Sequence, residues 1–429
     1  MYFRRVPLNA GGAARGSKKM TKVGIGYGNE QDGYSLGRTV AHSALQSGGM
    51  ERADLVLAFC SGHVDLDRFY QGLRSVIGES TPIIGGSSVG IITWDELSYH
   101  GYPAAVAAIE SDVMKFAVAS AGGLESDEAA TGQRLVDGLP LSDADRMLLV
   151  FYDSVRVPAG QPGPPVLNSS APLLEGLEGK LSGHVPVFGA GLVGDYGFGH
   201  TRQFCGFKVD TQQAVGCMMS GNLSVYQTIM HGCIPLDGIY RKITKMQGDV
   251  IYELDGKPVV PVINELFGST EWQQERPIVC NLTIGINYGE RYGTPLESNY
   301  VNRLITGVIH DGSGIGMFES DLEPDQEIQF MVRDNRMMLK SVRENTPAIL
   351  EKIKSEGKRA RFALYIDCGG RTAEQSVTET EEAAEVQRVL KQAGVPLLGF
   401  YSGVEIAPMM GRSRGLDWTG VLVILAEDF

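Results

Sequence analysis

The sequence has few of the features that mark membrane, secreted or nucleic-acid-binding proteins. No apolar run approaches the ~20 residues that a membrane-spanning helix requires, and the N-terminus lacks the apolar region of a secretory signal. Basic residues are in the minority, with 38 Lys and Arg against 51 Asp and Glu and a net charge of −13. We therefore expect no membrane association and no nucleic-acid partner.

Cysteine and histidine are also scarce, and their spacing favours a cytoplasmic protein without a metal site. The six cysteines form no C-x-x-C pair and lie mostly in apolar runs, which predicts buried, reduced thiols. The seven histidines form no H-x-x-x-H or H-E-x-x-H motif and do not pair with cysteine at metal spacing. The C-x-x-C-H motif of covalently attached haem is absent, but non-covalent haem needs only one axial histidine and stays open.

Length and composition describe a globular protein with a sizeable core. A chain of 429 residues with 43% hydrophobic residues predicts roughly two to three domains. Glycine is abundant, at 55 residues, and predicts many tight loops. Residues 1–20 are rich in Gly, Ala and Arg and end at Met20, so we interpret them as a disordered tail or an over-extended start. A chain that begins at Met20 is expected to keep the same thermal midpoint.

One unit of strand, helix and strand occurs three times in the sequence. In each copy an apolar strand leads to a helix, the helix stops at glycine, and a Pro-apolar-apolar-Gly strand follows. The strands that open the units are residues 55–60, 147–152 and 362–366, and the closing strands begin at Pro82, Pro186 and Pro396. Two strands joined by a helix are normally parallel, with a right-handed crossover. We expect each closing strand to be buried and parallel to its opening strand.

The segments that follow the closing strands are β-like rather than helical, which favours mixed sheets. These runs are residues 104–109, 206–209, 214–219 and 420–425. Residues 240–345 form a β-rich insertion with an Asp-Gly turn at 255–256. The predicted fold class is therefore α/β in the mixed α+β sense, with three strand-helix-strand repeats in mixed sheets and a β-rich C-terminal insertion.

Several further elements are expected from local signals. Within the insertion we expect a short helix at 259–267 and strands at 278–286, 303–310, 315–318 and 328–332. Residues 335–354 predict a helix that Pro347 breaks or kinks. The proline-rich stretch 154–172 predicts an extended surface loop.

These residues resemble the FIST proteins, a sensory family with paired N- and C-terminal FIST domains. The N-terminal resemblance rests on Asp54 to Leu57 leading into Cys60-Ser61, on Pro82 to Gly90, and on Phe188-Gly189 onwards. The C-terminal resemblance rests on Leu254 to Pro258, Asp367 to Arg371 and Gly399 to Ile406. The order and spacing of these motifs cover residues 53 to 410. The resemblance divides the chain into a FIST N-terminal domain at 21–240 and a FIST C-terminal domain at 241–429.

The resemblance implies a bacterial signal-transduction sensor that binds a small ligand such as an amino acid. The chain shows no kinase, cyclase or F-box signature of its own, so a partner such as a histidine kinase or cyclase would supply the output. Some relatives are nitric-oxide-sensing haem proteins, which makes haem the alternative cofactor; otherwise we expect none. A serine or cysteine hydrolase is the second alternative.

Two motifs suggest enzymes, but their contexts argue against this. Gly86-Ser87-Ser88-Val89-Gly90 fits the nucleophile-elbow pattern, yet the next residues are β-like where the elbow needs a helix. Gly24-x-Gly26-x-Gly28 has Asn29 where a dinucleotide fingerprint needs its third glycine, so we interpret it as a tight turn. We expect no catalytic activity and no catalytic residues.

The candidate binding site lies at the carboxyl ends of the strands, where loops vary and backbone N–H groups are free. Small, polar and charged residues gather there: Cys60, Ser61, Gly85, Gly86, Ser87, Ser88, Cys368, Gly369, Gly370, Arg371, Tyr401 and Glu405. Such a mixture suits a small carboxylate or zwitterion, with Arg371 on the carboxylate and Glu405 on the ammonium. A salt bridge at the surface, with Glu405 as a partner, is the structural alternative for Arg371. Cys60 and Cys368 are expected at the same place in copies one and three.

Overall fold

The computed structural model describes residues 20–157, 166–181, 183, 185–274, 282–376 and 378–428. The expected tail up to residue 19, residues 158–165 of the proline-rich stretch, and Cys280 lie outside the described residues. No helix in the described part is long and apolar enough to cross a membrane.

The first unit begins the chain and ends near residue 111. It comprises β1 (Thr21–Asn29), α1 (Gly33–Gly48), β2 (Leu55–Ser61), α2 (Leu66–Ile77), β3 (Ile83–Ser88), β4 (Ile91–Thr93), β5 (Leu97–Ser98) and β6 (Pro103–Ser111). Helix α2 begins where the Asp65 carboxylate accepts the Arg68 N–H, and it ends at Gly78 with φ of 84°.

The second unit repeats this order with longer connections. It comprises β7 (Met114–Gly122), α3 (Glu128–Asp137), β8 (Asp145–Asp153), β9 (Val155–Val157), β10 (Val166–Leu167), α4 (Ser170–Glu178), β11 (Val187–Leu192), β12 (Gln203–Gly206), β13 (Val209–Asp210) and β14 (Gln213–Gly221). Helix α4 ends at Glu178 and is capped by Gly179. Leu181, beyond the helix, packs against the same core as α4.

The third unit carries the β-rich insertion between its first strand and its first helix. It comprises β15 (Ser224–Met230), α6 (Asn335–Ser355), β24 (Lys358–Cys368), η3 (Gly369–Arg371), α7 (Ala373–Ser376), α8 (Glu382–Ala393), β25 (Leu397–Ser402), β26 (Val404–Met409), β27 (Arg412–Leu416) and β28 (Gly420–Asp428). Helix α6 runs through Pro347 as one helix, so the expectation of a break there is wrong.

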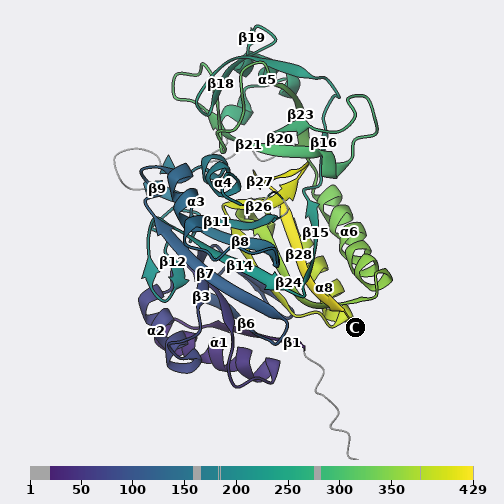
Figure 1. Cartoon of the computed structure of the whole chain (residues 1–429). Coiled ribbons are helices and arrows are strands. Elements are labelled where there is room, and N and C mark those ends of the chain that lie inside the picture. The colour runs from purple at the N-terminus through teal and green to yellow at the C-terminus, as the bar shows by residue number, and fades with distance from the viewer. Residues whose placement is uncertain are drawn as a thin grey trace, which may run out of the picture.

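The insertion folds into its own sheet at the upper end of Figure 1. It comprises β16 (Cys233–Pro235), β17 (Arg241–Gln247), β18 (Val250–Leu254), β19 (Lys257–Pro258), α5 (Val259–Phe267), η1 (Glu271–Gln274), β20 (Leu282–Asn287), η2 (Glu297–Asn299), β21 (Tyr300–Val308), β22 (Ile315–Met317) and β23 (Glu327–Arg333). The expected boundary near residue 240 falls between β16 and β17, which both pair with β23. As a division of the chain, that boundary stays a prediction.

The three units give three six-stranded sheets with one common strand order. The sheets run β1-β6-β2-β3-β12-β13, β7-β14-β8-β11-β26-β27 and β15-β28-β24-β25-β4-β5. In each sheet the opening and closing strands are parallel, with Val56 opposite Ile83, Leu148 opposite Val187 and Ala363 opposite Leu397. Ile83, Val187 and Leu397 are fully buried. The predicted mixed sheets and parallel pairs are confirmed.

Each unit gives two strands to the sheet of another unit. Strands β4 and β5 of the first unit join the third sheet through β25, and β12 and β13 of the second unit join the first sheet through β3. Strands β26 and β27 of the third unit join the second sheet through β11. The first unit thus contributes to the third sheet, the third to the second, and the second to the first, so each unit is paired with both of the others.

A common core lies between the inner faces of the three sheets, and the helices cover the outer faces. Phe59 of β2, Phe151 of β8 and Phe400 of β25 meet there, with the rings of Phe59 and Phe400 stacked 3.8 Å apart. Separate apolar clusters hold α1 and α2, α3 and α4, and α6 and α8 on their sheets. Figure 1 shows these three helix pairs on different sides of the molecule.

Glycines let α1 pack directly on β1. An added Cβ at Gly24 would lie 1.9 Å from the Ala44 carbonyl oxygen, and one at Gly26 would lie 1.9 Å from the Val40 carbonyl oxygen. The interpretation of this glycine run as a tight turn is therefore wrong, because Gly24 and Gly26 lie inside β1 and make room for the helix backbone.

Candidate ligand pocket

A small pocket opens where the carboxyl ends of the strands meet the β-rich insertion. Val89 follows β3 and Val193 follows β11. Ser402 is the last residue of β25, and Gly403 comes directly after it. Leu304 of β21 and Phe318, both from the insertion, form the opposite wall. The cavity measures about 50 Å³. Its lining residues are Val89, Val193, Asp195, Tyr196, Phe198, Leu304, Phe318, Cys368, Gly369, Gly370, Ser402, Gly403, Asp417 and Trp418.

Asp417 is the buried carboxylate of this pocket. It lies in the turn between β27 and β28 and is 2% exposed. Its Oδ2 accepts the backbone N–H of Leu304 at 2.9 Å, whereas Oδ1 has no partner among the described residues. Burial raises the pKa of Asp417 to about 6, so the carboxylate is mostly ionised at neutral pH.

A wider depression of about 410 Å³ adjoins this pocket at Tyr196. The Tyr196 hydroxyl lies 2.8 Å from the carbonyl oxygen of Gly369 and 2.8 Å from the Thr372 hydroxyl. Val89, Asp195 and Tyr196 line both spaces. The two spaces therefore share one part of their walls.

Cys368 and Trp418 form the wall next to η3. An added Cβ at Gly370 would lie 2.6 Å from the Trp418 Nε1, so only glycine allows η3 to approach the indole this closely. Burial raises the pKa of the Cys368 thiol well above its usual value. A thiol held in its neutral form is a weak nucleophile, which argues against the cysteine-hydrolase alternative.

Arg371 lies behind the pocket, in a fully buried ion pair. Its Nε lies 2.7 Å from a Glu382 carboxylate oxygen and 3.0 Å from one of Asp367. Its Nη1 donates to the carbonyl oxygens of His231 and Trp418, both at 3.0 Å. The alternative of a surface salt bridge with Glu405 is wrong, because the pair is buried and its acids are Glu382 and Asp367.

Glu405 and Tyr401 are also buried behind the lining. Glu405 accepts the Ser402 hydroxyl at 2.8 Å and the Thr419 N–H at 3.2 Å. Burial raises its pKa well above the usual value. The Tyr401 hydroxyl donates to the Glu381 carboxylate. Glu405 and the Tyr401–Glu381 pair thus bond to groups of the protein, and none of the three is among the lining residues.

The candidate residues of the first unit lie at the ends of β2 and β3. Gly85 and Gly86 have φ of 127° and 149°, and an added Cβ at either would collide with backbone. The Ser87 hydroxyl accepts the Arg202 N–H at 3.1 Å, and the Ser88 hydroxyl donates to the Gly90 carbonyl at 3.3 Å. Ser61 accepts the His63 N–H at 3.3 Å. Strand β4 follows Ser88, so the serine does not stand on a strand-turn-helix elbow.

The sheet register corrects the expected equivalence of Cys60 and Cys368. Cys60 pairs with Ser87, whereas Cys368 pairs with Ser402, one position further along its parallel strand. A shift of one residue turns a side chain to the other face of a sheet. Cys60 accordingly packs under α1 and α2, and Cys368 packs with Leu304 and Trp418 at the pocket.

The residues of the pocket do not fit a haem. Among the described residues that line it there is no histidine, and 50 Å³ holds only a few atoms. His231 is the buried histidine of the described part. Its Nδ1 accepts the Cys233 N–H at 2.9 Å and its Nε2 lies 2.8 Å from the Glu297 carbonyl oxygen, so neither ring nitrogen is open to iron. The described residues also contain no cluster of three or more metal-ligating side chains.

Of the twelve candidate residues, Cys368, Gly369 and Gly370 line the pocket. The aromatic and acidic lining residues were missed because they follow β11, β22 and β27, whose ends were not among the strand ends considered in the sequence. Asp417 and Trp418 lie in the short turn between β27 and β28, and a charged residue beside tryptophan in such a turn is the signal that could have found these two. Ser402 and Gly403 lie inside the motif at 399–406 that carried the family resemblance.

Comparison with protein families gives two adjacent matches. The model of the FIST N domain matches residues 54–257, and the model of the FIST C domain matches residues 260–408. The chain is similar to the uncharacterised protein Mb0898c of Mycobacterium bovis, at 27% identity over 56% of this chain and 61% of the relative. It is similar to the uncharacterised protein MT0656 of Mycobacterium tuberculosis, at 28% identity over 59% and 64%. The matched region thus spans less than two thirds of these relatives.

Solved structures give only distant likenesses. A cyanuric acid hydrolase from A. caulinodans aligns with a TM-score of 0.34 and 10% identity over 95% of this chain and 99% of that one. PurLQS from Thermotoga maritima aligns with a TM-score of 0.21 and 8% identity over 95% and 72%. At TM-scores this low, the likenesses bear on neither fold nor function.

Proposed function

The chain belongs to the FIST family, whose domains are generally sensory and signal-transduction modules, and from this premise we propose that it binds a small organic ligand in the pocket around Asp417 and signals through a partner protein. The observation that carries the proposal is the unpartnered oxygen of Asp417 in the wall of a small, mostly apolar pocket. A concave apolar site with a few convergent polar groups is the usual form of a ligand site.

The position of the pocket supports a signalling role rather than simple storage. Leu304 and Phe318 belong to the insertion, whereas Cys368 and Ser402 belong to the third sheet. A ligand between them contacts both parts at once, so its binding energy can favour one arrangement of the two over another. The insertion is the surface through which a histidine kinase or a cyclase would detect the bound state.

We place this activity in the bacterial cytoplasm. Five of the cysteines are buried as free thiols in the described part, as suits a reducing compartment. The relatives reported above are mycobacterial. The pocket supplies no activated nucleophile, since burial keeps the Cys368 thiol neutral, so we assign a binding role and not catalysis.

A thermal-shift screen with a pocket-filling variant tests the proposal. Small amino acids, amines, carboxylates and neutral amides are screened against the parent protein, because a ligand at a hundred times its dissociation constant stabilises by roughly 2.7 kcal/mol. Val89→Phe adds four carbon atoms at a position that is 6% exposed in the pocket wall, and it is expected to abolish the shift. Val166→Phe, at a site that is 45% exposed on β10, is the matched control and should keep it.

Two results would contradict the proposal. One is that no compound stabilises the parent; the other is that every stabilising compound acts equally on Val89→Phe. The link to the insertion is followed by hydrogen exchange, where a ligand should slow exchange in β21 and β22 as well as in β24 and β25.

A further inference from the structure

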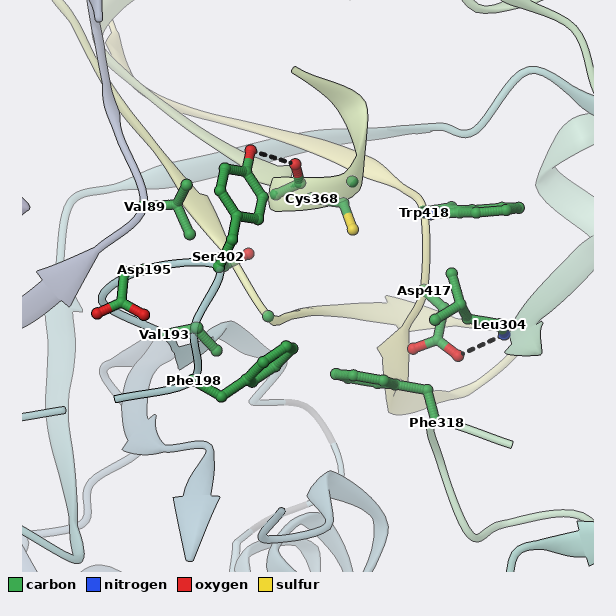
Figure 2. A pocket seen from close by; sticks show the side chains of 14 residues that line it. Val89, Val193, Asp195, Phe198, Leu304, Phe318, Cys368, Ser402, Asp417 and Trp418 are labelled. Carbon is green, nitrogen blue, oxygen red and sulfur yellow. Dashed lines mark hydrogen bonds between the residues drawn. The ribbon is translucent and has the colours of Figure 1, made fainter. Parts of the chain in front are cut away.

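The charges in the pocket wall are of one sign. Its lining includes the carboxylates of Asp195 and Asp417, and among the described lining residues there is no Lys, Arg or His. Figure 2 shows one oxygen of Asp417 on the dashed line to Leu304 and the other turned toward the cavity, whereas Asp195 lies at the opposite end. A buried carboxylate oxygen without a donor is costly, and such groups normally have a partner. The pocket thus lacks the hydrogen-bond donor that its own carboxylate requires.

Aromatic rings surround this carboxylate. In Figure 2 the rings of Trp418 and Phe318 lie on opposite sides of Asp417, and Phe198 lies across the cavity from it. The face of an aromatic ring is electronegative and attracts cations. The Arg333 guanidinium lies 4.4 Å from the centre of the Trp418 ring, so the Trp418 ring already makes a cation–π contact within the protein. Phe198 and Phe318 supply the attraction inside the cavity.

The groups behind Asp417 give its carboxylate no hydrogen-bonded cation among the described residues. The Arg303 guanidinium donates to Asp321 at 2.6 Å and to the carbonyl oxygens of Asn302 and Gly415, and it acts on Asp417 only through its charge, which lowers the pKa of that carboxyl. Burial and the charge of Asp417 raise the pKa of the neighbouring Glu319 to about 8, so Glu319 is mostly protonated at neutral pH. The ionised Asp417 carboxylate is therefore the group that a cation in the cavity would pair with.

The size of the cavity limits the cation. Each water-sized position takes roughly 10–15 Å³ of such volume, so about 50 Å³ accommodates on the order of four non-hydrogen atoms. An ammonium group with a two- or three-carbon apolar body meets this limit. Larger polyamines and nucleotides do not.

We propose that the ligand of this pocket is a small primary ammonium ion whose –NH3⁺ group donates to Asp417 Oδ1 while its carbon chain lies against Phe198 and Phe318. This inference rests on the proposed function, because it names the ligand class of the same pocket. It differs from the expectation of a carboxylate held by Arg371, since the guanidinium of Arg371 is bound to Glu382 and Asp367 and lies outside the lining.

A matched series of probes tests the charge preference on the parent protein. n-Propylammonium, 1-propanol and propionate each contain three carbon atoms and differ in the charge of the head group. In ligand-observed NMR titrations we expect n-propylammonium to bind with a dissociation constant of about 0.1–10 mM, the range that so few atoms permit. We expect 1-propanol to bind at least tenfold more weakly and propionate more weakly still.

Equal or tighter binding of 1-propanol or propionate overturns the ammonium assignment, and so does no binding of n-propylammonium. These results differ from failure of the proposed function, which requires that no compound of any charge class stabilises the parent in a manner sensitive to Val89→Phe. If a neutral or anionic ligand binds and its binding depends on Val89, the proposed sensor function stands and only the ammonium assignment is wrong.

Asp417→Asn tests the contact itself. The asparagine carbonyl can still accept the Leu304 N–H, while its NH2 group turns a donor toward the cavity. n-Propylammonium affinity should fall roughly 10- to 100-fold, the usual range for a charged hydrogen bond. Asp54→Asn is the matched control, because Asp54 accepts the Ser111 N–H at 2.8 Å and lies outside the pocket. Unchanged affinity in Asp417→Asn overturns the proposal, and if that variant does not fold, the order of the three probes on the parent decides.

Discussion

The charge of Arg371 is balanced by two acids of the protein itself, so the role of this residue is structural. Its guanidinium is fully buried between Asp367 and Glu382, and both of those acids are buried as well. Removing one partner of a buried ion pair leaves uncompensated charge in a poorly solvated place, which typically costs about 3–5 kcal/mol. We predict that Arg371→Ala lowers the free energy of unfolding by about this amount in urea denaturation.

Arg343→Ala is the control for Arg371→Ala. Arg343 also pairs with a glutamate, Glu385, at 2.5 Å, but its side chain is 54% exposed. Exposed ion pairs contribute about 0–1 kcal/mol, so this variant should stay close to the parent. If Arg371→Ala unfolds within about 1 kcal/mol of the parent, the ion pair does not have the structural role that its burial indicates.

The proposed ammonium contact also predicts how binding depends on pH. Burial raises the pKa of Asp417 to about 6 while the charge of Arg303 lowers it, and the acidic groups that interact with it are Asp321, Glu319, Glu405 and the Cys368 thiol. Only the ionised carboxylate attracts a cation, and a primary ammonium with a pKa near that of lysine, about 10.4, keeps its proton throughout. Affinity for n-propylammonium should therefore fall about tenfold from pH 7 to pH 5. Titrations at half-unit intervals measure this.

Asp417→Asn provides the reference for this pH profile, since an amide does not titrate. Its weaker affinity should be nearly flat between pH 5 and pH 7. A parent profile that is equally flat, or one that rises toward pH 5, contradicts the assignment of Asp417 as the cation-binding group.

At the scale of elements, the close contact between α1 and β1 requires glycine in β1, because its side chain is a single hydrogen atom. An added Cβ at Gly26 would lie 1.9 Å from the Val40 carbonyl oxygen and 2.8 Å from the Ala44 nitrogen, both of them backbone atoms of α1. Neither can move without separating the helix from the strand. We predict that Gly26→Ala lowers the free energy of unfolding by roughly 1–3 kcal/mol or more, as measured in denaturant.

Gly49→Asn is the control for this overpacking. Gly49 caps α1 with φ of 59°, and an added Cβ there meets nothing within 4 Å. Asparagine tolerates the left-handed region, so its cost should be a few tenths of a kcal/mol. If the two variants are equally stable, the helix has enough freedom to move away from β1.

The elements that the sequence predicted correctly are those with strong local signals. The three Pro-apolar-apolar-Gly strands and their helices were readable because capping glycines and apolar runs act over a few residues. The residues Gly24 and Gly26 were misread as a turn, although alternate positions share one face of a strand and a helix can pack on that face. Cys60 and Cys368 were wrongly expected at equivalent positions because the pairing register of strands is decided across the sheet and not along the chain.

The candidate site was predicted only in part, because its residues come from distant segments. Cys368, Gly369 and Gly370 were found at the end of a strand, where ligand sites are expected. Leu304 and Phe318 reach the pocket only because the insertion folds back over the third sheet, and Asp417 reaches it through a short turn. The Asp417-Trp418 turn is a local signal, but no local pattern shows which distant segments meet there. The charge of the pocket, which decides the ligand class, therefore became visible only in the structure.

At the scale of the whole molecule, the strand exchange predicts that the two halves of the chain depend on each other. The third sheet takes β15, β4 and β5 from before residue 240 and β28, β24 and β25 from after it. The second sheet takes β26 and β27 from after that residue. Fully buried side chains such as Ile91 and Ile92 of β4 are covered by this arrangement. Separated halves would expose apolar faces and unpaired strand edges, which favour association.

We therefore predict that fragments 20–240 and 241–428 do not fold independently. Each alone should show a broad, low-amplitude thermal transition by near-ultraviolet circular dichroism, because the common core around Phe59, Phe151 and Phe400 is incomplete in both. Refolding the two together at equal concentration should restore one cooperative transition near the parent midpoint, since β4 can then pair with β25 and β26 with β11. A monomeric 20–240 fragment that unfolds cooperatively at the parent midpoint would show instead that residue 240 separates two independent domains, and that the exchanged strands only decorate units already stable without them.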